Sequence, residues 1–363
     1  MSVVDRIIGF MKASRTDLGC FVDREDEIEK IVNEFPCGRL AVVMGPRGCG
    51  KSTLAYTLVG ALEKISGYTG FYLAYREEEG VLKSLLRVSN VSTRLLRETL
   101  RDQLESVSSG LVKVSGLVDL MDLITSIAGR KFLRKREIIV FIDEFRGEAI
   151  RVRQVLEVDA NTVRWLYGMG YRVKTIYLTS DATASWLQLE LGSKIDWYLM
   201  WNLSREDFVE IYNNVCKKQC IDYDLLWRIV GGNPRELYVL AIGYKWSLRD
   251  YIGEKIAFTR RLFREYMRET RASLEDVLSE LKATNRDIDN SSTYPVYKHL
   301  VRNNVLMDID MRFKRLTRIT REQWIGDEVA YQIPVYYWLI KTITKQHTLD
   351  ITPNQVTETI KRE

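Results

Sequence analysis

An eight-residue run at positions 45–52 has the residue types and the spacing of a phosphate-binding loop, because it fits the pattern G-x-x-x-x-G-K-[ST]. Its glycines allow main-chain conformations in which successive N–H groups point inward at a phosphate. The ammonium of Lys51 can reach the β- and γ-phosphates, and the hydroxyl of Ser52 can ligate Mg²⁺. The expected nucleotide contacts are Gly45, Pro46, Arg47, Gly48, Cys49, Gly50, Lys51, Ser52 and the next residue, Thr53.

A strand and a helix must position this loop. Residues 40–44 are a short apolar run, as in a buried parallel strand, and residues 53–59 carry apolar side chains at helical spacing. A glycine-rich turn without a ligand is the alternative for the motif taken alone. The order strand, loop, helix favours nucleotide binding.

Two adjacent carboxylates, Asp143 and Glu144, end a second apolar run that begins at Glu137. In parallel α/β sheets, ligands bind at the carboxyl ends of the strands, so we expect both acids beside the phosphate loop. Successive strand residues point to opposite faces, which lets the two acids act differently. Asp143 is expected to bind Mg²⁺ and Glu144 to polarise the attacking water, although such a pair can also simply begin a loop.

A third polar group is expected at the same edge of the sheet. Residues 171–178 form an apolar-rich strand that ends at Thr179. The hydroxyl of Thr179 can bond the γ-phosphate or the attacking water. The alternative is that the polar residues here, Ser180 or Asp181, cap the following helix.

The alternation of strands and helices up to about residue 203 predicts an α/β fold with a five-stranded parallel sheet. We expect residues 81–130 to be a mostly helical insertion. The five expected strands cover residues 40–44, 70–75, 137–144, 171–178 and 196–201.

From Ser204 onward the pattern is helical and begins with a capping box. Within it, two glycines end one helix and Pro234 begins the next, which leaves Arg235 near a helix N-terminus. Arginine suits bidentate phosphate contact, although a surface arginine at a helix break is the alternative. We expect an α/β domain at 1–203, a helical lid at 204–258, a basic domain at 259–341 and a polar tail at 342–363.

The third of these segments predicts a winged-helix module. Residues 259–321 hold 14 Lys or Arg and 9 Asp or Glu. Their net charge is therefore +5, which is the net charge of the whole chain. Helices followed by an alternating stretch at 307–319, taken as a hairpin, give the winged-helix order. Such modules bind either duplex DNA or another protein. The expected phosphate contacts on DNA are Arg302, Arg312, Lys314, Arg315 and Arg318.

The composition, 46% apolar and 28% charged over 363 residues, is that of an ordinary globular protein. No apolar run is long enough to span a bilayer and no signal peptide is evident, so we expect a cytoplasmic protein. Five cysteines are too few for a complete disulfide framework, and we expect free thiols, including Cys216 and Cys220.

These motifs together resemble the archaeal ATPase family, a branch of AAA+-like P-loop NTPases close to the STAND class. The resemblance covers about residues 20–320 and rests on Gly45–Ser52, Ile138–Glu144 and the lid motif Gly231–Leu237. It implies ATP and Mg²⁺ as ligands. It further implies that Phe21, Val22 and Arg24 lie against the nucleotide base, and that Pro234 and Arg235 face the γ-phosphate from the lid.

The function expected from these features is that of an ATP-hydrolysing switch or motor whose nucleotide state controls the C-terminal domain, for DNA binding or processing. A regulatory scaffold whose winged domain binds protein is the alternative. ATP and ADP, duplex DNA and further copies of the chain are the expected partners.

Overall fold

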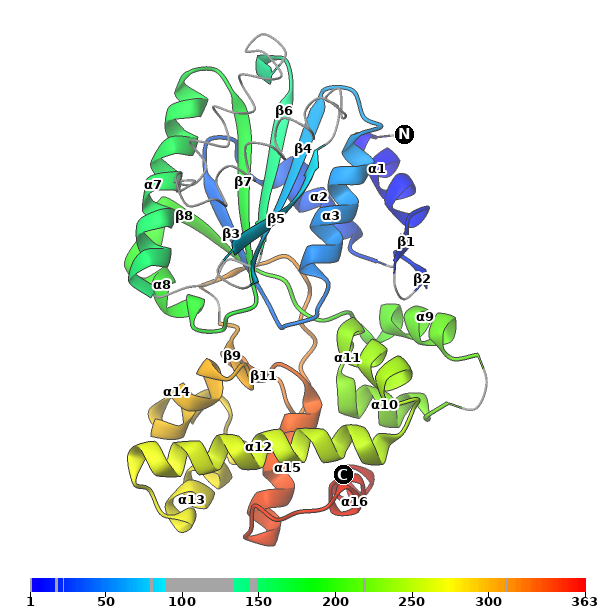
Figure 1. Ribbon diagram of the computed structural model, residues 1–363, viewed down its shortest axis with the longest axis vertical. Helices are drawn as coiled ribbons and strands as arrows, with labels where there is room; N and C mark the ends of the chain where they lie inside the picture. The colour runs from blue at the N-terminus through cyan, green and yellow to red at the C-terminus, as the bar shows by residue number, and fades with distance from the viewer. Residues whose placement is uncertain are drawn as a thin grey trace.

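The computed structural model has a β-sheet covered by helices, and a second, mostly helical part below it (Figure 1). The description covers residues 2–16, 19–21, 23–78, 81–88, 133–143, 149–217, 220–310 and 312–363.

The central sheet contains six parallel strands and one antiparallel strand among the described residues, in the order β10-β8-β3-β7-β6-β4-β5. The five strands expected from the sequence are all present, and they are parallel to one another. Two further strands, β5 and β10, extend the sheet at its edges. The strands are β3 (Leu40–Met44), β4 (Tyr68–Glu78), β5 (Val81–Val88), β6 (Glu137–Asp143), β7 (Arg172–Thr179), β8 (Ile195–Leu199) and β10 (Lys314–Arg315).

Helices cover both faces of the sheet, which explains why β3, β6 and β8 are buried along their whole length and are mostly apolar. Alternate residues of β3 belong to two different cores: Leu40, Val42 and Met44 to one, Ala41 and Val43 to the other. The first core lies under α7 (Ala149–Gly168) and α8 (Ala184–Leu191). The other lies under α1 (Val3–Lys12), α2 (Glu25–Glu29), the π-helical turn η1 (Lys30–Glu34) and α3 (Lys51–Leu62).

The helical prediction for residues 81–88 is wrong, because this segment forms β5 and pairs antiparallel with β4. Its apolar residues occur at spacings that suit both a helix and a strand, so the pattern could not separate the two. The edge of β4 supplies the hydrogen-bonding partner that decides for a strand. The rest of the predicted helical insertion, from residue 89 to 130, lies outside the described residues.

The second part is built from helices and one small antiparallel pair. The N-cap expected at Ser204 is present, and Ser273 caps another helix of this part. The elements are α9 (Arg205–Val215), α10 (Tyr223–Val230), α11 (Pro234–Tyr238), η4 (Val239–Gly243), α12 (Leu248–Thr270), α13 (Leu274–Arg286), η5 (Asp289–Thr293), α14 (Pro295–Arg302), β9 (Leu306–Asp308), β11 (Val329–Tyr331), α15 (Pro334–Gln346) and α16 (Pro353–Arg362).

Two features of this part differ from the expected division of the chain. The boundary placed after residue 258 lies inside the continuous helix α12. The expected polar tail is helical: it forms the end of α15 and the whole of α16, which buries Val356 and Ile360 against the rest of the core. A capping box at Thr352 begins α16, and the apolar residues of this helix share one face. The segment is therefore an amphipathic helix packed on the core and not a polar tail.

The hairpin predicted at 307–319 is also wrong. Its first arm, β9, pairs with β11 more than twenty residues later, and its second arm, β10, joins the central sheet beside β8. We call residues 304–332 the return segment, because it leaves the helical part, adds a strand to the sheet and comes back. The Leu316 N–H donates to the carbonyl of Leu199, which continues the pairing beyond β10.

Cys216 and Cys220 form a disulfide, whereas we expected thiols. The chain leaves α9 at Val215 and is extended at Cys216, so the two Cα atoms lie 6.0 Å apart, within the normal range for a disulfide. Cys37 and Cys49 are free cysteines. Among the described helices, none is long and apolar enough to cross a membrane.

Candidate functional site

The phosphate loop has the expected setting between β3 and α3. Gly48 and Gly50 have φ values of 86° and 106°, in the left-handed region that favours glycine. Gly45 is required for a different reason, since a Cβ atom there would lie 1.9 Å from the carbonyl oxygen of Met200. The ammonium of Lys51 is buried and donates to the carbonyls of Gly45 and Pro46, at 2.8 and 3.0 Å.

Three further residues complete the loop. Cys49 is fully buried, and its thiol lies 3.6 Å from the carbonyl oxygen of Met200. The side chain therefore fills space under the loop, as expected of a small residue. Ser52 and Thr53 are exposed in the first turn of α3. A helix N-terminus favours bound anions, so their hydroxyls and amides lie where a phosphate and its metal ion would be held.

Asp143 ends β6, two strands away from the loop, with β7 between them. Its carboxylate is buried and accepts a hydrogen bond of 2.7 Å from the hydroxyl of Tyr72 on β4. Tyr72 was not expected from the sequence, and this bond fixes the direction of the carboxylate. Glu144 lies outside the described residues.

Thr179 ends β7 and is paired in register with Met44, the last residue before the loop. The expected proximity of the strand end to the phosphate loop is therefore present. The hydroxyl of Thr179 accepts the N–H of Asp181, and the carboxylate of Asp181 accepts the N–H of Thr183 before α8 begins. Thr179 therefore lies beside the loop, its contact with a phosphate or water stays a prediction, and Asp181 holds the turn that precedes α8.

The segment around Phe21, Val22 and Arg24, expected against the nucleotide base, makes other contacts where it is described. Phe21 is buried, and Val22 lies outside the described residues. Arg24 has φ of 81° and is only 3% exposed, so it does not present its guanidinium to an open surface. The guanidinium donates to the side chains of Glu27 and Thr317, at 2.7 and 3.1 Å, and to the carbonyls of Cys49 and Trp201, at 2.7 and 2.9 Å.

Arg24 therefore holds the phosphate loop from behind, through the carbonyl of Cys49. A guanidinium that donates to four acceptors inside the protein has little freedom to contact a nucleotide base. Its charge is balanced by Glu27, which is also buried. The sequence pattern located this residue at the site, but its contacts are with the protein.

The lid motif lies directly on the phosphate loop. Gly231 and Gly232 have positive φ values, and Asn233 caps α11, in which Pro234 is the first residue. The side-chain amide of Asn233 donates to the carbonyl of Arg47 at 3.0 Å. The exposed Arg235 approaches so closely that a Cβ atom on Gly48 would lie 2.4 Å from its own Cβ.

Two residues of the return segment reach the same place, although no sequence pattern indicated them. The carboxamide oxygen of Gln332 accepts the main-chain N–H of Arg47 at 3.2 Å. The carboxamide oxygen of Asn304 accepts the N–H of Ala182, in the loop after β7, at 3.2 Å. The one available signal was a glutamine inside the apolar run 329–340, where a polar side chain must find a buried partner.

The five basic residues expected on a DNA-binding hairpin do not share one. Arg302 ends α14, and Lys314 and Arg315 belong to β10 in the central sheet. Arg312 forms an ion pair with Asp310, and Lys314 forms one with Asp196 at 2.9 Å. Arg302 and Arg318 are exposed.

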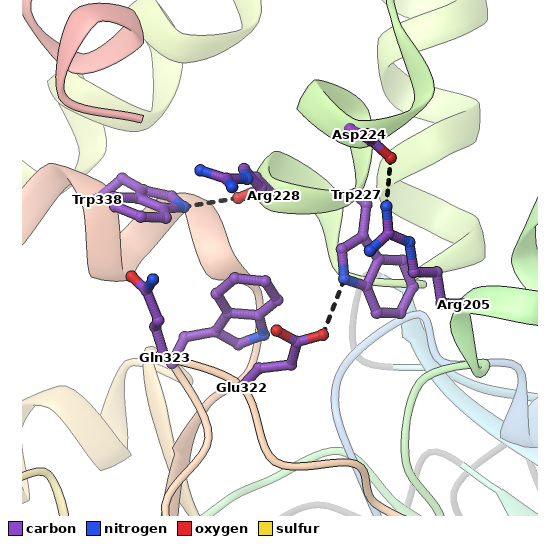
Figure 2. Close-up of a pocket in the computed structure, with 8 residues that line it drawn as sticks. Arg205, Asp224, Trp227, Arg228, Glu322, Gln323 and Trp338 are labelled. Carbon is purple, nitrogen blue, oxygen red and sulfur yellow. Dashed lines mark hydrogen bonds and ion pairs between the residues drawn. The ribbon is translucent and has the colours of Figure 1, made fainter. Parts of the chain in front are cut away.

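A separate cavity of about 180 Å³ lies between α10 and the return segment (Figure 2). Its polar groups are largely bonded to one another: the indole N–H of Trp227 donates to Glu322, and that of Trp338 donates to the carbonyl of Arg228. None of its lining residues belongs to the phosphate loop. The lining residues are Arg205, Asp224, Trp227, Arg228, Glu322, Gln323, Trp324 and Trp338.

Comparison with known proteins agrees with this site. A family model described as an ATPase domain predominantly from Archaea matches residues 21–240. No curated protein sequence matches the chain. Among solved structures, the Walker-type ATPase PABY2304 of Pyrococcus abyssi is similar over 88% of this chain and 96% of its own, with a TM-score of 0.51 and 14% identity. At that identity the likeness concerns the fold.

Two other solved structures are much more distant in fold. One is a structure of Drosophila ORC bound to DNA, with a TM-score of 0.32 and 15% identity over 61% of this chain and 56% of that one. The other is an E. coli HORMA:CdnC:Trip13 complex, with a TM-score of 0.29 and 12% identity over 59% of this chain and 62% of that one. The family match covers more than half of the chain and includes the phosphate loop, Asp143 and Arg235. The chain therefore belongs to the family of ATPase domains found predominantly in Archaea, and it is an ATP-hydrolysing enzyme.

Proposed function

We propose that this ATPase is a nucleotide-controlled switch, in which ATP at the phosphate loop sets the position of the helices that follow residue 204. One observation carries the proposal. The lid begins on the loop itself, since Asn233 donates to the carbonyl of Arg47 and the N–H of Arg235 lies 3.4 Å from the carbonyl of Gly48. A ligand that moves the loop must move the start of α11.

The proposed roles follow from the chemistry of the side chains. Lys51 binds the β- and γ-phosphates, and Arg235 reaches the γ-phosphate from the lid. Glu144 polarises the attacking water, and Thr179 orients that water or a phosphate oxygen. Hydrolysis then removes the group that Arg235 contacts, so the lid loses its hold on the nucleotide.

Mg²⁺ suits the oxygen donors at this site. Ser52 offers a hydroxyl in the first turn of α3, and Asp143 offers a carboxylate whose direction is fixed by Tyr72. Hard oxygen ligands are those that Mg²⁺ prefers, and Mg²⁺ usually keeps several waters and binds few protein groups. Ser52 and Asp143 would hold the ion, which would neutralise charge on the transferred phosphoryl group.

The C-terminal part is proposed to receive the signal. Three helices, α12 to α14, followed by the β9–β11 pair give the order of a winged-helix module, which supports that assignment. DNA binding has less support than expected, because Arg312 and Lys314 are ion-paired and the predicted basic hairpin is absent. Contact with protein, including further copies of the chain, is therefore the favoured use of this part.

The hydrolytic assignment is tested with Glu144→Gln. This variant should bind ATP as tightly as the unchanged protein, because the phosphate loop is intact. It should turn over about 100-fold more slowly or worse, because it lacks the carboxylate that polarises water. ATP binding by fluorescence and steady-state phosphate release measure the two effects. Unchanged turnover would remove Glu144 from the proposed role.

The switch itself is tested by comparing Arg235→Ala with Arg249→Ala, an exposed arginine on α12. With a non-hydrolysable ATP analogue, hydrogen exchange in α11 should differ from that with ADP, and only Arg235→Ala should abolish the difference. Sizing the protein in both nucleotide states, with and without duplex DNA, separates the partners. Nucleotide-dependent oligomers without DNA affinity support protein contact, and salt-sensitive DNA binding supports the DNA role.

A further inference from the structure

Gln332 connects the return segment to the phosphate loop through a bond whose direction is fixed. The main-chain N–H of Arg47 can only donate, so the carboxamide of Gln332 must turn its oxygen toward the loop. Its nitrogen then faces away and donates to the carboxamide oxygen of Asn304, at 3.3 Å. That same oxygen accepts the N–H of Ala182, which again can only donate.

These bonds form a relay of two carboxamides between the two polar loops of the nucleotide site. One end is the phosphate loop at Arg47, and the other is the loop that follows Thr179. Gln332 is 3% exposed, and its main chain is also held, by the N–H donated to Val305 and by the carbonyl that accepts from Asn202. A buried side chain held in this way has one orientation.

The main chain of Arg47 is thus held on both sides by distant residues. Gln332 accepts its N–H, and Asn233 of the lid donates to its carbonyl. Main-chain N–H groups of this loop are the donors that cradle phosphate oxygens. An uncharged carboxamide oxygen at such a donor has the same acceptor chemistry as a phosphate oxygen, but without the charge.

We propose that Gln332 reads the terminal phosphate of the nucleotide, by competing with it for the main-chain N–H of Arg47. Arg47 lies at the lid side of the loop, since Asn233 of the lid donates to its carbonyl, and it stands before the residues that begin α3, so the competing group is the γ-phosphate and not the phosphates nearer α3. ATP displaces the Gln332 carboxamide, whereas ADP leaves it in place. The inference rests on the proposed binding of ATP at this loop and adds the residue that distinguishes it from ADP.

Displacement of Gln332 has a consequence beyond the loop. Its nitrogen loses alignment with Asn304, and the return segment is then held to the phosphate loop by one bond fewer. Gln332 stands two residues before Pro334, the first residue of α15, so the signal passes directly to a helix of the C-terminal part. Gln332 is in this sense a specificity-determining residue.

The test compares affinities for ADP and for a non-hydrolysable ATP analogue, both with Mg²⁺, in Gln332→Met and Gln332→Glu. The methionine removes the competing acceptor at similar volume, so the ratio of ATP-analogue to ADP affinity should rise about five- to tenfold, the value of one hydrogen bond. The glutamate places a charge at the same position, so the ratio should fall about tenfold or more. Gln323→Met, exposed at the cavity in Figure 2, is the matched control and should leave the ratio unchanged.

A purely structural role for Gln332 predicts a different result, since both variants would then weaken ADP and the analogue equally, and this would overturn the inference. Hydrogen exchange of the unchanged protein provides the second measurement. The N–H of Ala182 should exchange faster with the analogue than with ADP if the relay opens, whereas the N–H of Arg47 passes from one acceptor to another; equal rates at Ala182 would also overturn the inference. If the unchanged protein binds neither nucleotide, the proposed function fails before the inference is reached.

Discussion

The phosphate loop and the return segment meet at one site, but the chain specifies them in opposite ways. The loop, Gly45–Ser52, is contiguous, and its residue types follow from the ligand and from the positive φ values of Gly48 and Gly50. The return segment contributes single residues, Thr317 and Gln332, whose partners lie far away in the sequence. A chemical motif can therefore be local in the sequence, while the residues that hold it in place are brought together by the fold.

Arg24 joins the two regions, because one guanidinium contacts both the loop at Cys49 and the return segment at Thr317. Lys30 adds a second connection from the same part of the chain, since its ammonium donates to the carbonyls of Arg315 and Leu316. The return segment is therefore built into the ATPase core and does not simply rest on it. Two variants test how strongly the two regions depend on each other, and a third tests the charge of the residue next to Arg24.

The largest effect is expected for Arg24→Met. This change leaves Glu27 buried without its charge partner and removes a donor from the carbonyls of Cys49 and Trp201. Breaking a buried ion pair by removing one partner costs about 3–5 kcal/mol. Urea unfolding should show that loss, and the double variant with Glu27→Gln should recover part of it. A loss below about 1 kcal/mol would mean that the two regions are independent.

A smaller effect is expected for Thr317→Val, which affects the return segment alone. The hydroxyl of Thr317 donates to Glu27 and accepts from Arg24 and from the N–H of Trp201. Valine has the same shape, so the change removes only these bonds and costs about 1–3 kcal/mol. Thr270→Val, at the exposed end of α12, should change the free energy of unfolding by no more than about 0.5 kcal/mol. Equal losses in both variants would contradict the role given to Thr317.

The smallest effect is expected at Asp23, beside Arg24. Burial, and with it the nearby carboxylates of Asp207 and Glu27, raises the pKa of Asp23 to about 6. The native state therefore holds this proton more tightly than the unfolded chain, and stability falls as the pH rises from about 4 to about 6. At pH 7.5 the ionised carboxylate is destabilising, by about 1 kcal/mol after allowance for solvent screening.

Asp23→Asn should therefore stabilise the protein at pH 7.5 and lose that advantage near pH 4. Asparagine also tolerates the positive φ of 53° at this position. Urea unfolding of both proteins at the two pH values measures the effect, and Asp26→Asn, an exposed acid on α2, is the control. A gain that is the same at both pH values would show that the charge of Asp23 is not its cause.

Most of the sheet edge that carries the phosphate loop could be predicted from the sequence, because strands and tight turns have residue preferences that act over a few neighbouring positions. Apolar runs gave the five parallel strands, and glycine spacing gave the loop. Parallel strands present their carboxyl ends at one edge, which placed Asp143 and Thr179 near that loop. The lid motif was also found locally, since helix-ending glycines and Pro234 have conformational requirements of their own.

The wrong predictions have one physical cause. Whether a segment forms a strand, a buried contact or a disulfide depends on the distant segment that it meets in the fold. Residues 81–88 form a strand because β4 offers an open edge, and Lys314–Arg315 form a strand because β8 does. The direction of the Arg24 guanidinium depends on carbonyls that tertiary folding brings around it. The same holds for the Cys216–Cys220 disulfide, which forms where the chain has left α9 at Val215.

The sequence alone therefore determined that this chain binds a nucleotide phosphate on a parallel sheet, since the required main-chain conformations depend on residues that are adjacent in the sequence. Only the tertiary structure decided which residues hold the loop in place. Gln332 and Asn304 have no local signature, because a carboxamide acquires a role only from the donor it meets. Burial made those meetings obligatory, since a polar group removed from water must find a partner within the fold.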